Sequence, residues 1–211
     1  MNKAASPSGQ KSAIMNVPNQ LTTLRLILSV VLFAFIEFDF YLASFFLFIV
    51  AGATDWLDGY WARKYGQVTT LGRILDPFAD KMIICGTYIF LAANPNSGLV
   101  AWMVVVVVGR EMLVTVLRSY MEGHGHDFSA NMPGKLKMVF QCFTAGASLY
   151  VLFRVQRMGG DATLESLNAG STAWLWWTLQ ISIWLTIFMT LYSGVIYVFG
   201  AAKMMNPDDG A

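Results

Sequence analysis

The sequence predicts an all-α integral membrane protein with six transmembrane helices, a short N-terminal interfacial helix and both termini in the cytoplasm. Of its 211 residues, 56% are hydrophobic and only 13% are charged, and the mean hydropathy is +0.53. Soluble domains carry roughly 25% charged residues, so this chain lacks the surface of one. Six apolar runs approach or exceed the roughly 20 residues that a membrane-spanning helix needs, and they leave no room for a soluble domain.

The six runs follow one another closely along the chain. They lie at residues 21–38, 40–62, 73–93, 98–121, 134–156 and 173–200. Residues 15–204 are therefore expected to form one membrane domain. The polar tail at 1–14 has the composition of a disordered segment, and residues 205–211 form a second tail. The stretch from Asn19 through Thr22 to Arg25 is expected to form the interfacial helix.

The placement of Lys and Arg sets the predicted orientation, because these residues favour cytoplasmic loops. The first connection carries Glu37 and Asp39, the third (NPNSG) is uncharged, and the fifth is flanked by Arg154 and Arg157. An even number of spans with cytoplasmic termini fits this pattern. Ten other cations gather at the two ends, in the second connection and around the fourth: Lys3, Lys11, Arg25, Arg63, Lys64, Arg73, Arg118, Lys135, Lys137 and Lys203.

Overall charge and cysteine content exclude some classes of function. The net charge is +1 and the pI about 7.7, which gives no basis for nucleic-acid binding. Cys85 and Cys142 both lie inside apolar runs and form neither a metal-binding nor a disulfide pattern. His124 and His126 flank a glycine in a loop, and two such residues are more typical of a solvated loop than of a metal site.

Two pairs of aspartates flank the second connection. Asp55 and Asp58 are three residues apart, and Asp76 and Asp80 are four apart, so each pair shares one face of its helix. The midpoint of the connection lies between positions 67 and 68, and the two pairs are nearly equidistant from it. If the two helices form an antiparallel hairpin, all four carboxylates converge at one depth near the cytoplasmic surface.

Four carboxylates at one depth repel each other unless cations compensate them. One alternative is ion pairing with the nearby cations Arg63, Lys64, Arg73 and Lys81. The matched depth favours bound divalent ions instead, Mg²⁺ or Mn²⁺, since these prefer oxygen ligands, and Ca²⁺ shares that preference. Two ions would hold phosphates between them. Gly59 and Ala62 keep the same helix face small, and Arg63 offers a planar fork for a phosphate.

These residues form the pattern D55-x-x-D58-G59-x-x-A62-R63, followed after eight residues by G72-x-x-x-D76-x-x-x-D80, which resembles the signature of the CDP-alcohol phosphotransferases. The resemblance implies six transmembrane helices, a homodimer, and two divalent ions held by the four aspartates. It also implies that an alcohol displaces CMP from a CDP-linked donor, with Asp80 as the general base. The residues expected to bind the donor are Asn19, Thr22, Asp55, Gly59, Ala62, Arg63 and Gly72. For Asn19 and Thr22, helix N-capping is an equal alternative.

Four further segments resemble the phosphatidylglycerophosphate synthases of that family: NVPNQLTTLRL at 16–26, LDPFADK at 75–81, GRE at 109–111 and PGKLKMVFQ at 133–141. This resemblance implies CDP-diacylglycerol as donor and glycerol 3-phosphate as acceptor. The expected location is a bacterial cytoplasmic membrane, and the charge pattern places the active site on its cytoplasmic side. Met138 stands where this branch is expected to have a threonine, and residues 122–132 are less typical of it.

A dianionic acceptor such as glycerol 3-phosphate needs a basic site. The candidate phosphate ligands are Arg110, Arg118, Lys135 and Lys137. Arg110 lies within an apolar run, where a cation is costly unless it is used. Its alternative role is an ion pair with a carboxylate, and Glu111 has the alternative of ordering Arg118, seven residues later on the same face.

Other readings stay open from the residues alone. The acceptor has inositol phosphate, serine, or phosphatidylglycerol (in cardiolipin synthesis) as alternatives. A divalent-cation transporter would also place carboxylates in the membrane, but it predicts acidic groups through the full depth, whereas here they gather at one side. A non-catalytic scaffold leaves the aspartates unexplained. The tryptophans of the last run are expected to belong to the interfacial belt and to packing.

Overall fold

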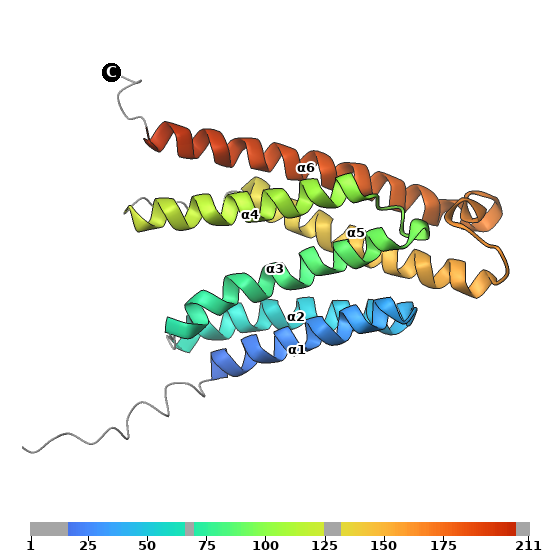
Figure 1. The fold of residues 1–211 in the computed structure, drawn as a ribbon, viewed down its shortest axis with the longest axis horizontal. Helices are drawn as coiled ribbons and strands as arrows, with labels where there is room; N and C mark the ends of the chain where they lie inside the picture. The colour runs from blue at the N-terminus through green and yellow to red at the C-terminus, as the bar shows by residue number, and fades with distance from the viewer. Residues whose placement is uncertain (1–16, 66–69, 125–131, 206–211) are drawn as a thin grey trace, which may run out of the picture. The chain divides into compact units, whose positions relative to one another are not determined.

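The computed structural model describes residues 17–65, 70–124 and 132–205; side chains at 17–22, 54–65, 70–77, 80 and 205 are outside the description. The regular structure of the described residues is entirely helical (Figure 1). Its elements are α1 (Val17–Glu37), α2 (Tyr41–Tyr65), α3 (Thr70–Ala93), η3 (Pro95–Ser97), α4 (Ala101–Gly123), α5 (Met132–Met158), η4 (Leu164–Asn168), η5 (Gly170–Thr172) and α6 (Ala173–Met205).

The all-α prediction is confirmed, and each of the six apolar runs corresponds to one α-helix whose ends differ from the predicted ends by at most five residues. The separate interfacial helix is wrong within the described residues. The chain instead forms one continuous helix from Val17 to Glu37. Pro18 lies in the first turn, where its missing N–H is tolerated, and no glycine or proline follows to end the helix before the membrane run.

The chain divides into two compact units, residues 1–86 and 87–211, and α3 contributes to both. In the first unit, α1 packs on α2, and a tight turn joins the two helices. Asp39 adopts a left-handed conformation (φ 62°). The amide of Asp39 donates to Ile36 (3.2 Å) and that of Phe40 to Phe35 (2.8 Å), while the Phe35 and Phe40 rings pack at 5.9 Å. This is a Schellman ending with its usual hydrophobic contact.

The first unit also has a close approach of α3 to α1. A Cβ built on Gly86 would lie 2.1 Å from the Phe33 ring, so only glycine leaves room for the ring as it stands. Phe33 is buried, and so are its α1 neighbours Leu32 and Ile36. Gly86 therefore fixes how α3 packs against α1.

In the second unit α6 packs against both α4 and α5, and Figure 1 shows α4 running beside α6. Short 3-10 helices close one end of this unit. The Asn96 side chain accepts a hydrogen bond from the Leu164 amide at 2.9 Å, which joins η3 to η4. Ser148 on α5 donates to the Ser97 carbonyl at 2.7 Å. Buried Leu164 and Leu167 anchor η4, so residues 158–172 form a packed cap.

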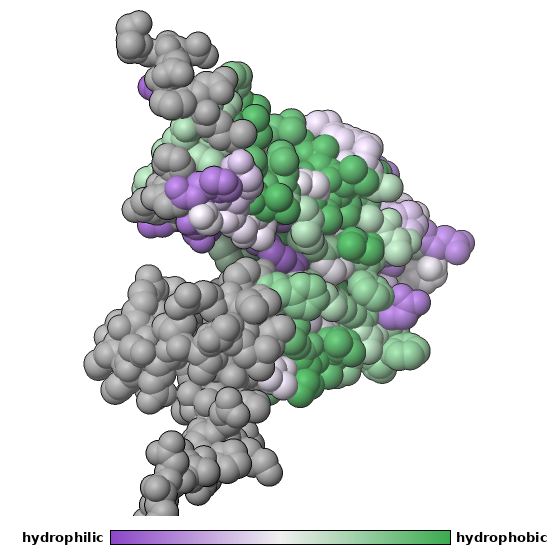
Figure 2. All heavy atoms as spheres, turned by 60° about the vertical axis from the view of Figure 1, so that its left-hand side comes forward, coloured by the Kyte–Doolittle hydropathy of each residue, from purple (hydrophilic) through white to green (hydrophobic). Residues whose placement is uncertain are grey.

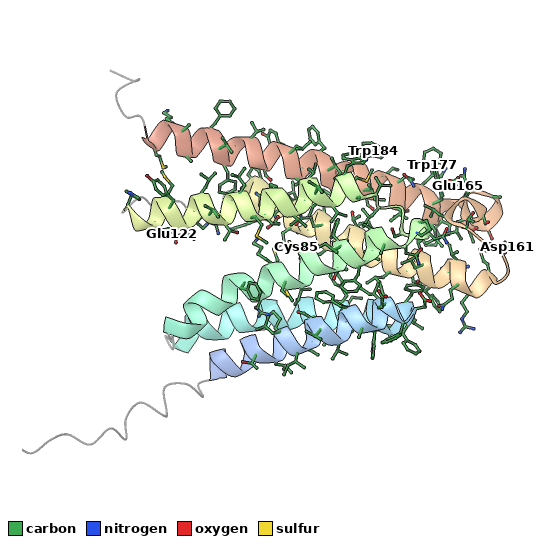
Figure 3. All side chains as sticks on the ribbon, in the orientation of Figure 1. Cys85, Glu122, Asp161, Glu165, Trp177 and Trp184 are labelled. Atoms are coloured by element: carbon green, nitrogen blue, oxygen red, sulfur yellow. The ribbon has the colours of Figure 1, made fainter. Side chains whose placement is uncertain are left out.

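The second unit places apolar side chains outside and small polar ones inside. Trp177 and Trp184 project from α6, whereas Glu122 lies at one end of the unit and Asp161 and Glu165 at the other (Figure 3). Figure 2 shows the same division, with a broad apolar surface between hydrophilic ends. The α5–α6 seam holds buried hydroxyls instead, including a Thr144–Thr186 hydrogen bond of 2.8 Å. An apolar exterior over a polar helix seam is typical of a membrane protein.

Two helical segments among the described residues are long and apolar enough to cross a membrane, Met132–Met158 and Gly170–Met204. Two shorter apolar stretches, Tyr41–Ala53 and Lys81–Ala93, belong to α2 and α3. Helix α4 has sufficient length, but Arg110, Glu111 and Arg118 interrupt its apolar sequence. Two of these charged residues, Arg110 and Arg118, are candidate phosphate ligands.

Candidate active site

The four predicted metal ligands all lie on helices of the first unit. Asp55 and Asp58 are on α2, and Asp76 and Asp80 are on α3; their side chains are outside the description. Asp55 lies ten residues before the end of α2, and Asp80 ten residues after the start of α3. At about 1.5 Å rise per residue, both are about 15 Å from the connection. The two distances along the helices are equal, and the convergence of the four carboxylates stays a prediction.

This donor set fits divalent cations. Four carboxylates at spacings of three and four on two helices supply oxygen ligands alone, which suit Mg²⁺ and Mn²⁺. Among the side chains that the structure describes, no three His, Cys, Asp or Glu residues gather into another possible metal site. His124 is exposed and hydrogen-bonds through Nδ1 to the Tyr120 carbonyl at 2.8 Å, while its predicted loop partner His126 is outside the described residues.

The predicted donor-binding residues share the helices of the first unit. They are Asn19 and Thr22 on α1, Asp55, Gly59, Ala62 and Arg63 on α2, and Gly72 on α3. Their side chains are outside the description. Asn19 and Thr22 lie inside the first two turns of α1, which begins at Val17, so neither is its N-cap; their donor role stays a prediction.

A buried polar network surrounds Glu111 in the second unit. The ammonium of Lys137 forms an ion pair with the Glu111 carboxylate and donates to Gln141 at 3.0 Å. Arg110 Nη1 lies 3.4 Å from the same carboxylate. Gln141 Nε2 lies 3.4 Å from Glu111 and 3.5 Å from Thr190. The network thus ties α4, α5 and α6 together around one carboxylate.

Two of the predicted phosphate ligands meet at one aromatic ring. The guanidinium carbons of Arg110 and Arg118 lie 5.3 Å and 5.8 Å from the centroid of the Tyr197 ring. Arg118 Nη2 also donates to the Tyr197 hydroxyl at 3.2 Å. Tyr197 is only 1% exposed. Both distances fall within the roughly 6 Å over which a cation is attracted to an aromatic face.

The two arginines retain buried donors with no hydrogen-bond acceptor among the described residues. These are Nε and Nη2 of Arg110 and Nε of Arg118. Buried donors are normally satisfied, and an exception calls for an explanation such as a ligand. The four groups Arg110, Arg118, Lys137 and Glu111 also carry an excess of two positive charges. An anion would satisfy both the donors and the charge.

The structure brings three of the four predicted acceptor residues into this cluster. Arg110 and Lys137 are buried, Arg118 is half-buried, and Lys135 is exposed near the start of α5. The expected alternative for Arg110, an ion pair with a carboxylate, is present in the contact with Glu111. Whether these residues bind an acceptor stays a prediction.

Sequence reasoning missed Tyr197. It assigned no chemistry to the aromatic residues of α6, because a tyrosine within an apolar run is ordinarily a packing residue. Two glycines lie close to this group in the structure, but they give no signal in the sequence. A Cβ on Gly134 would lie 3.0 Å from the Tyr197 hydroxyl, and one on Gly194 would lie 3.3 Å from Arg110. Neither contact can be foreseen without the fold.

Comparison with known proteins identifies the family. The family model for CDP-alcohol phosphatidyltransferases matches residues 15–192, which include all four aspartates and the cation cluster up to α6. The chain belongs to the CDP-alcohol phosphatidyltransferase family. The match confirms the resemblance seen in the aspartate pattern.

Several curated relatives of this chain share one name. The chain is 32% identical to the CDP-diacylglycerol–glycerol-3-phosphate 3-phosphatidyltransferase of Bacillus subtilis, over 87% of this chain and 94% of the relative. It is 30% identical to the second enzyme of this name from Arabidopsis thaliana, over 87% of this chain and 82% of the relative. A Pseudomonas fluorescens enzyme of the same name is 37% identical over 51% of this chain and 56% of its own.

Family membership settles the class of protein. The chain is a transferase of phospholipid biosynthesis, and its family is generally dependent on divalent metal ions. Together with the two apolar helices, membership indicates a membrane protein. The transporter and scaffold alternatives do not account for this relationship.

Proposed function

We propose that this enzyme transfers the phosphatidyl group of CDP-diacylglycerol to sn-glycerol 3-phosphate. The acceptor hydroxyl oxygen attacks the phosphorus that carries the diacylglycerol. The bond from that phosphorus to the oxygen of CMP breaks, and the hydroxyl proton passes to a base. The products are phosphatidylglycerophosphate and CMP, and the base of the enzyme holds the proton.

The observation that carries this proposal is the agreement of the relatives' names over nearly the full chain. The second unit adds independent support. Among the described residues, Arg110, Arg118, Lys137 and Glu111 have an excess of two positive charges, and three nitrogens of the two arginines have no hydrogen-bond acceptor, which suits a phosphate dianion. Serine has no phosphate and would not need this cluster. Inositol phosphate would use it, so it is the acceptor to exclude.

Within this proposal each group of residues has one role. Asp55, Asp58, Asp76 and Asp80 hold two divalent cations, which when bound neutralise the charge of the donor diphosphate. Asp80 takes the proton from the acceptor hydroxyl. Asn19, Thr22, Gly59, Ala62, Arg63 and Gly72, with Asp55, bind the CDP group. Arg110, Arg118 and Lys135 bind the acceptor phosphate, and Lys137 supports them through Glu111.

The proposal includes a topology. Six helices span a bacterial cytoplasmic membrane, both termini and the active site face the cytoplasm, and residues 15–204 form one membrane domain between two tails. Cytoplasmic access suits both a soluble acceptor and the release of CMP. A homodimer is the proposed assembly. The lipid donor reaches its site from the bilayer.

An acceptor competition tests the function. Purified full-length protein would receive CDP-diacylglycerol, Mn²⁺ or Mg²⁺, and equal concentrations of glycerol 3-phosphate, inositol phosphate and serine, and the lipid product would be identified by its mass. We expect phosphatidylglycerophosphate from the wild type and loss of activity by at least about a hundredfold in Asp80→Asn, the range that general-base removal produces. Another phospholipid as the main product would overturn the acceptor, and the absence of CMP release would overturn the reaction.

The acceptor cluster has its own matched test. Arg118→Gln removes a proposed phosphate ligand, and we expect the KM for glycerol 3-phosphate to rise about tenfold to a hundredfold, since a hydrogen bond to a charged group contributes about 1.5–3 kcal/mol. Arg157→Gln is the control, because Arg157 is an exposed arginine in the last turn of α5. Equal effects of the two substitutions would contradict the assignment.

A further inference from the structure

Tyr197 occupies a position that packing alone does not explain. Its ring is buried among Val114, Met121 and Ala201, with Leu117 beside them. These apolar neighbours belong to the same buried cluster as Tyr197. Two arginines approach the same ring, and one of them donates to its hydroxyl. A tyrosine that served only to fill space would not need to meet two cations.

The contacts of Tyr197 oppose the repulsion between these cations. Arg110 and Arg118 carry like charges, and their attraction to one ring brings both guanidinium groups to within 6 Å of its centroid. Attraction to a desolvated aromatic face is stronger than at an exposed one. The hydroxyl accepts one N–H of Arg118, so it also sets the rotation of that guanidinium group.

The backbone on either side limits movement of these side chains. Gly134 on α5 passes so close to the Tyr197 hydroxyl that a Cβ there would lie at 3.0 Å, and Gly194 on α6 would place a Cβ 3.3 Å from Arg110 Cγ. Both distances are tighter than ordinary van der Waals contact. Two glycines thus admit the tyrosine and one arginine into a space that a larger residue would narrow.

We propose that Tyr197 is a positioning residue that holds Arg110 and Arg118 together as one receptor for the phosphate of the acceptor. This inference rests on the proposed function of the cluster. The donors that remain, Nε and Nη2 of Arg110 and Nε of Arg118, are buried without an acceptor among the described residues. Tyr197 leaves these donors available for the ligand because it engages the arginines through its ring and one N–H.

Two substitutions separate the ring from the hydroxyl. Tyr197→Phe keeps the ring and loses the acceptor of Arg118, so we expect the KM for glycerol 3-phosphate to rise about threefold. Tyr197→Leu loses both, and we expect a rise of about tenfold or more, which corresponds to about 1.4 kcal/mol. In both variants the KM for CDP-diacylglycerol should stay within about twofold of the wild type. Phenylalanine should therefore restore about half of the binding free energy that leucine loses.

Tyr192→Leu is the matched control. Tyr192 lies on the same helix, is 50% exposed and stacks on Phe188. We expect both KM values to stay unchanged in it. A structural role for Tyr197 would instead lower the unfolding temperature and the turnover number and leave the KM for the acceptor unchanged. If Tyr197→Leu does not yield folded protein, the phenylalanine variant decides, and an unchanged acceptor KM there overturns the proposal.

A binding measurement separates this inference from the proposed function. Glycerol 3-phosphate would be titrated into wild-type and variant protein by calorimetry, without CDP-diacylglycerol. Binding by the wild type but weaker binding by Tyr197→Leu supports both proposals. Equal binding by the two proteins overturns the role of Tyr197 alone. An absence of binding to the wild type, together with turnover of another acceptor, overturns the proposed function and the inference that rests on it.

Discussion

Glu111 shows how one buried residue can organise several cations. It is 1% exposed and pairs with Lys137, which is 4% exposed, and with Arg110. Removing one partner of a buried pair leaves an uncompensated charge, whereas removing both can be nearly neutral. The Glu111–Lys137 pair is therefore better understood as fixing the geometry of α4 against α5 than as a net source of stability.

A double-mutant cycle tests this reading. We expect Glu111→Gln and Lys137→Met each to lower the free energy of unfolding by about 3–5 kcal/mol, because each leaves its partner buried and charged. The double variant should lose less than the sum of the two. The measurement is unfolding by SDS in mixed micelles. Glu165→Gln, an exposed change in η4, is the control and should shift the free energy by less than about 0.5 kcal/mol. Additive losses would contradict the coupling.

At the scale of single elements, the helices were predictable because length and hydropathy determine them. A run of about 20 apolar residues has few alternatives to a membrane helix. The separate N-terminal helix was wrong because a polar beginning does not by itself interrupt a helix. The 3-10 helices were not predicted, although η3 and η4 each have a local cap. The hydrogen bond that joins them lies between residues 68 positions apart, Asn96 and Leu164, and only the fold shows it.

Gly86 provides a test of helix packing. We expect Gly86→Ala to lower the free energy of unfolding by about 1–3 kcal/mol, the usual effect of overpacking, because the added Cβ overlaps the Phe33 ring. Thermal and SDS unfolding would measure this. Phe33→Leu in the same chain should recover part of the loss by making room for the methyl group.

Gly52→Ala is the control for Gly86. Gly52 lies on α2 and is exposed, and a Cβ added there would have no described neighbour within 4 Å. Alanine favours a helix over glycine by about 1 kcal/mol, so this variant should be neutral or slightly more stable. A destabilisation equal to that of Gly86→Ala would show that loss of glycine, and not contact with Phe33, is responsible.

At the scale of the whole molecule, the sequence was most informative about chemistry that depends on spacing along one or two helices. The aspartate positions follow from spacings of three and four, and they pointed to the family that the comparison confirmed. The acceptor cluster was predicted in part, since cations within apolar runs are unusual. Glu111 lies next to Arg110 in the sequence and was a candidate partner, but Lys137 and Tyr197 come from other helices, and only tertiary packing shows that they meet these residues.

The proposed topology makes a prediction about opposite ends of α6. This helix has 33 residues and is about 50 Å long, more than the roughly 30 Å of the hydrocarbon core. Residues 158–172 before it contain Asp161 and Glu165 but no Lys or Arg, whereas Lys203 lies in its last turn. With cytoplasmic termini, Asp161 lies on the outer side of the membrane and Lys203 on the cytoplasmic side. This agrees with the preference of cations for the cytoplasmic side, whereas Arg154 and Arg157 flank the outer connection.

Cysteine labelling in intact cells tests this orientation. Cys85 and Cys142, the two natural cysteines, would first be replaced by alanine, and that chain is the control for background labelling. Asp161→Cys should react with a membrane-impermeant maleimide added outside, and Lys203→Cys should react only after the membrane is permeabilised. Both residues are exposed, so access to reagent is decided by the membrane. Labelling of both residues from outside would show that α6 does not span the membrane. A reversed pattern would place the C terminus outside the cytoplasm, together with the end of α4 that carries Glu122.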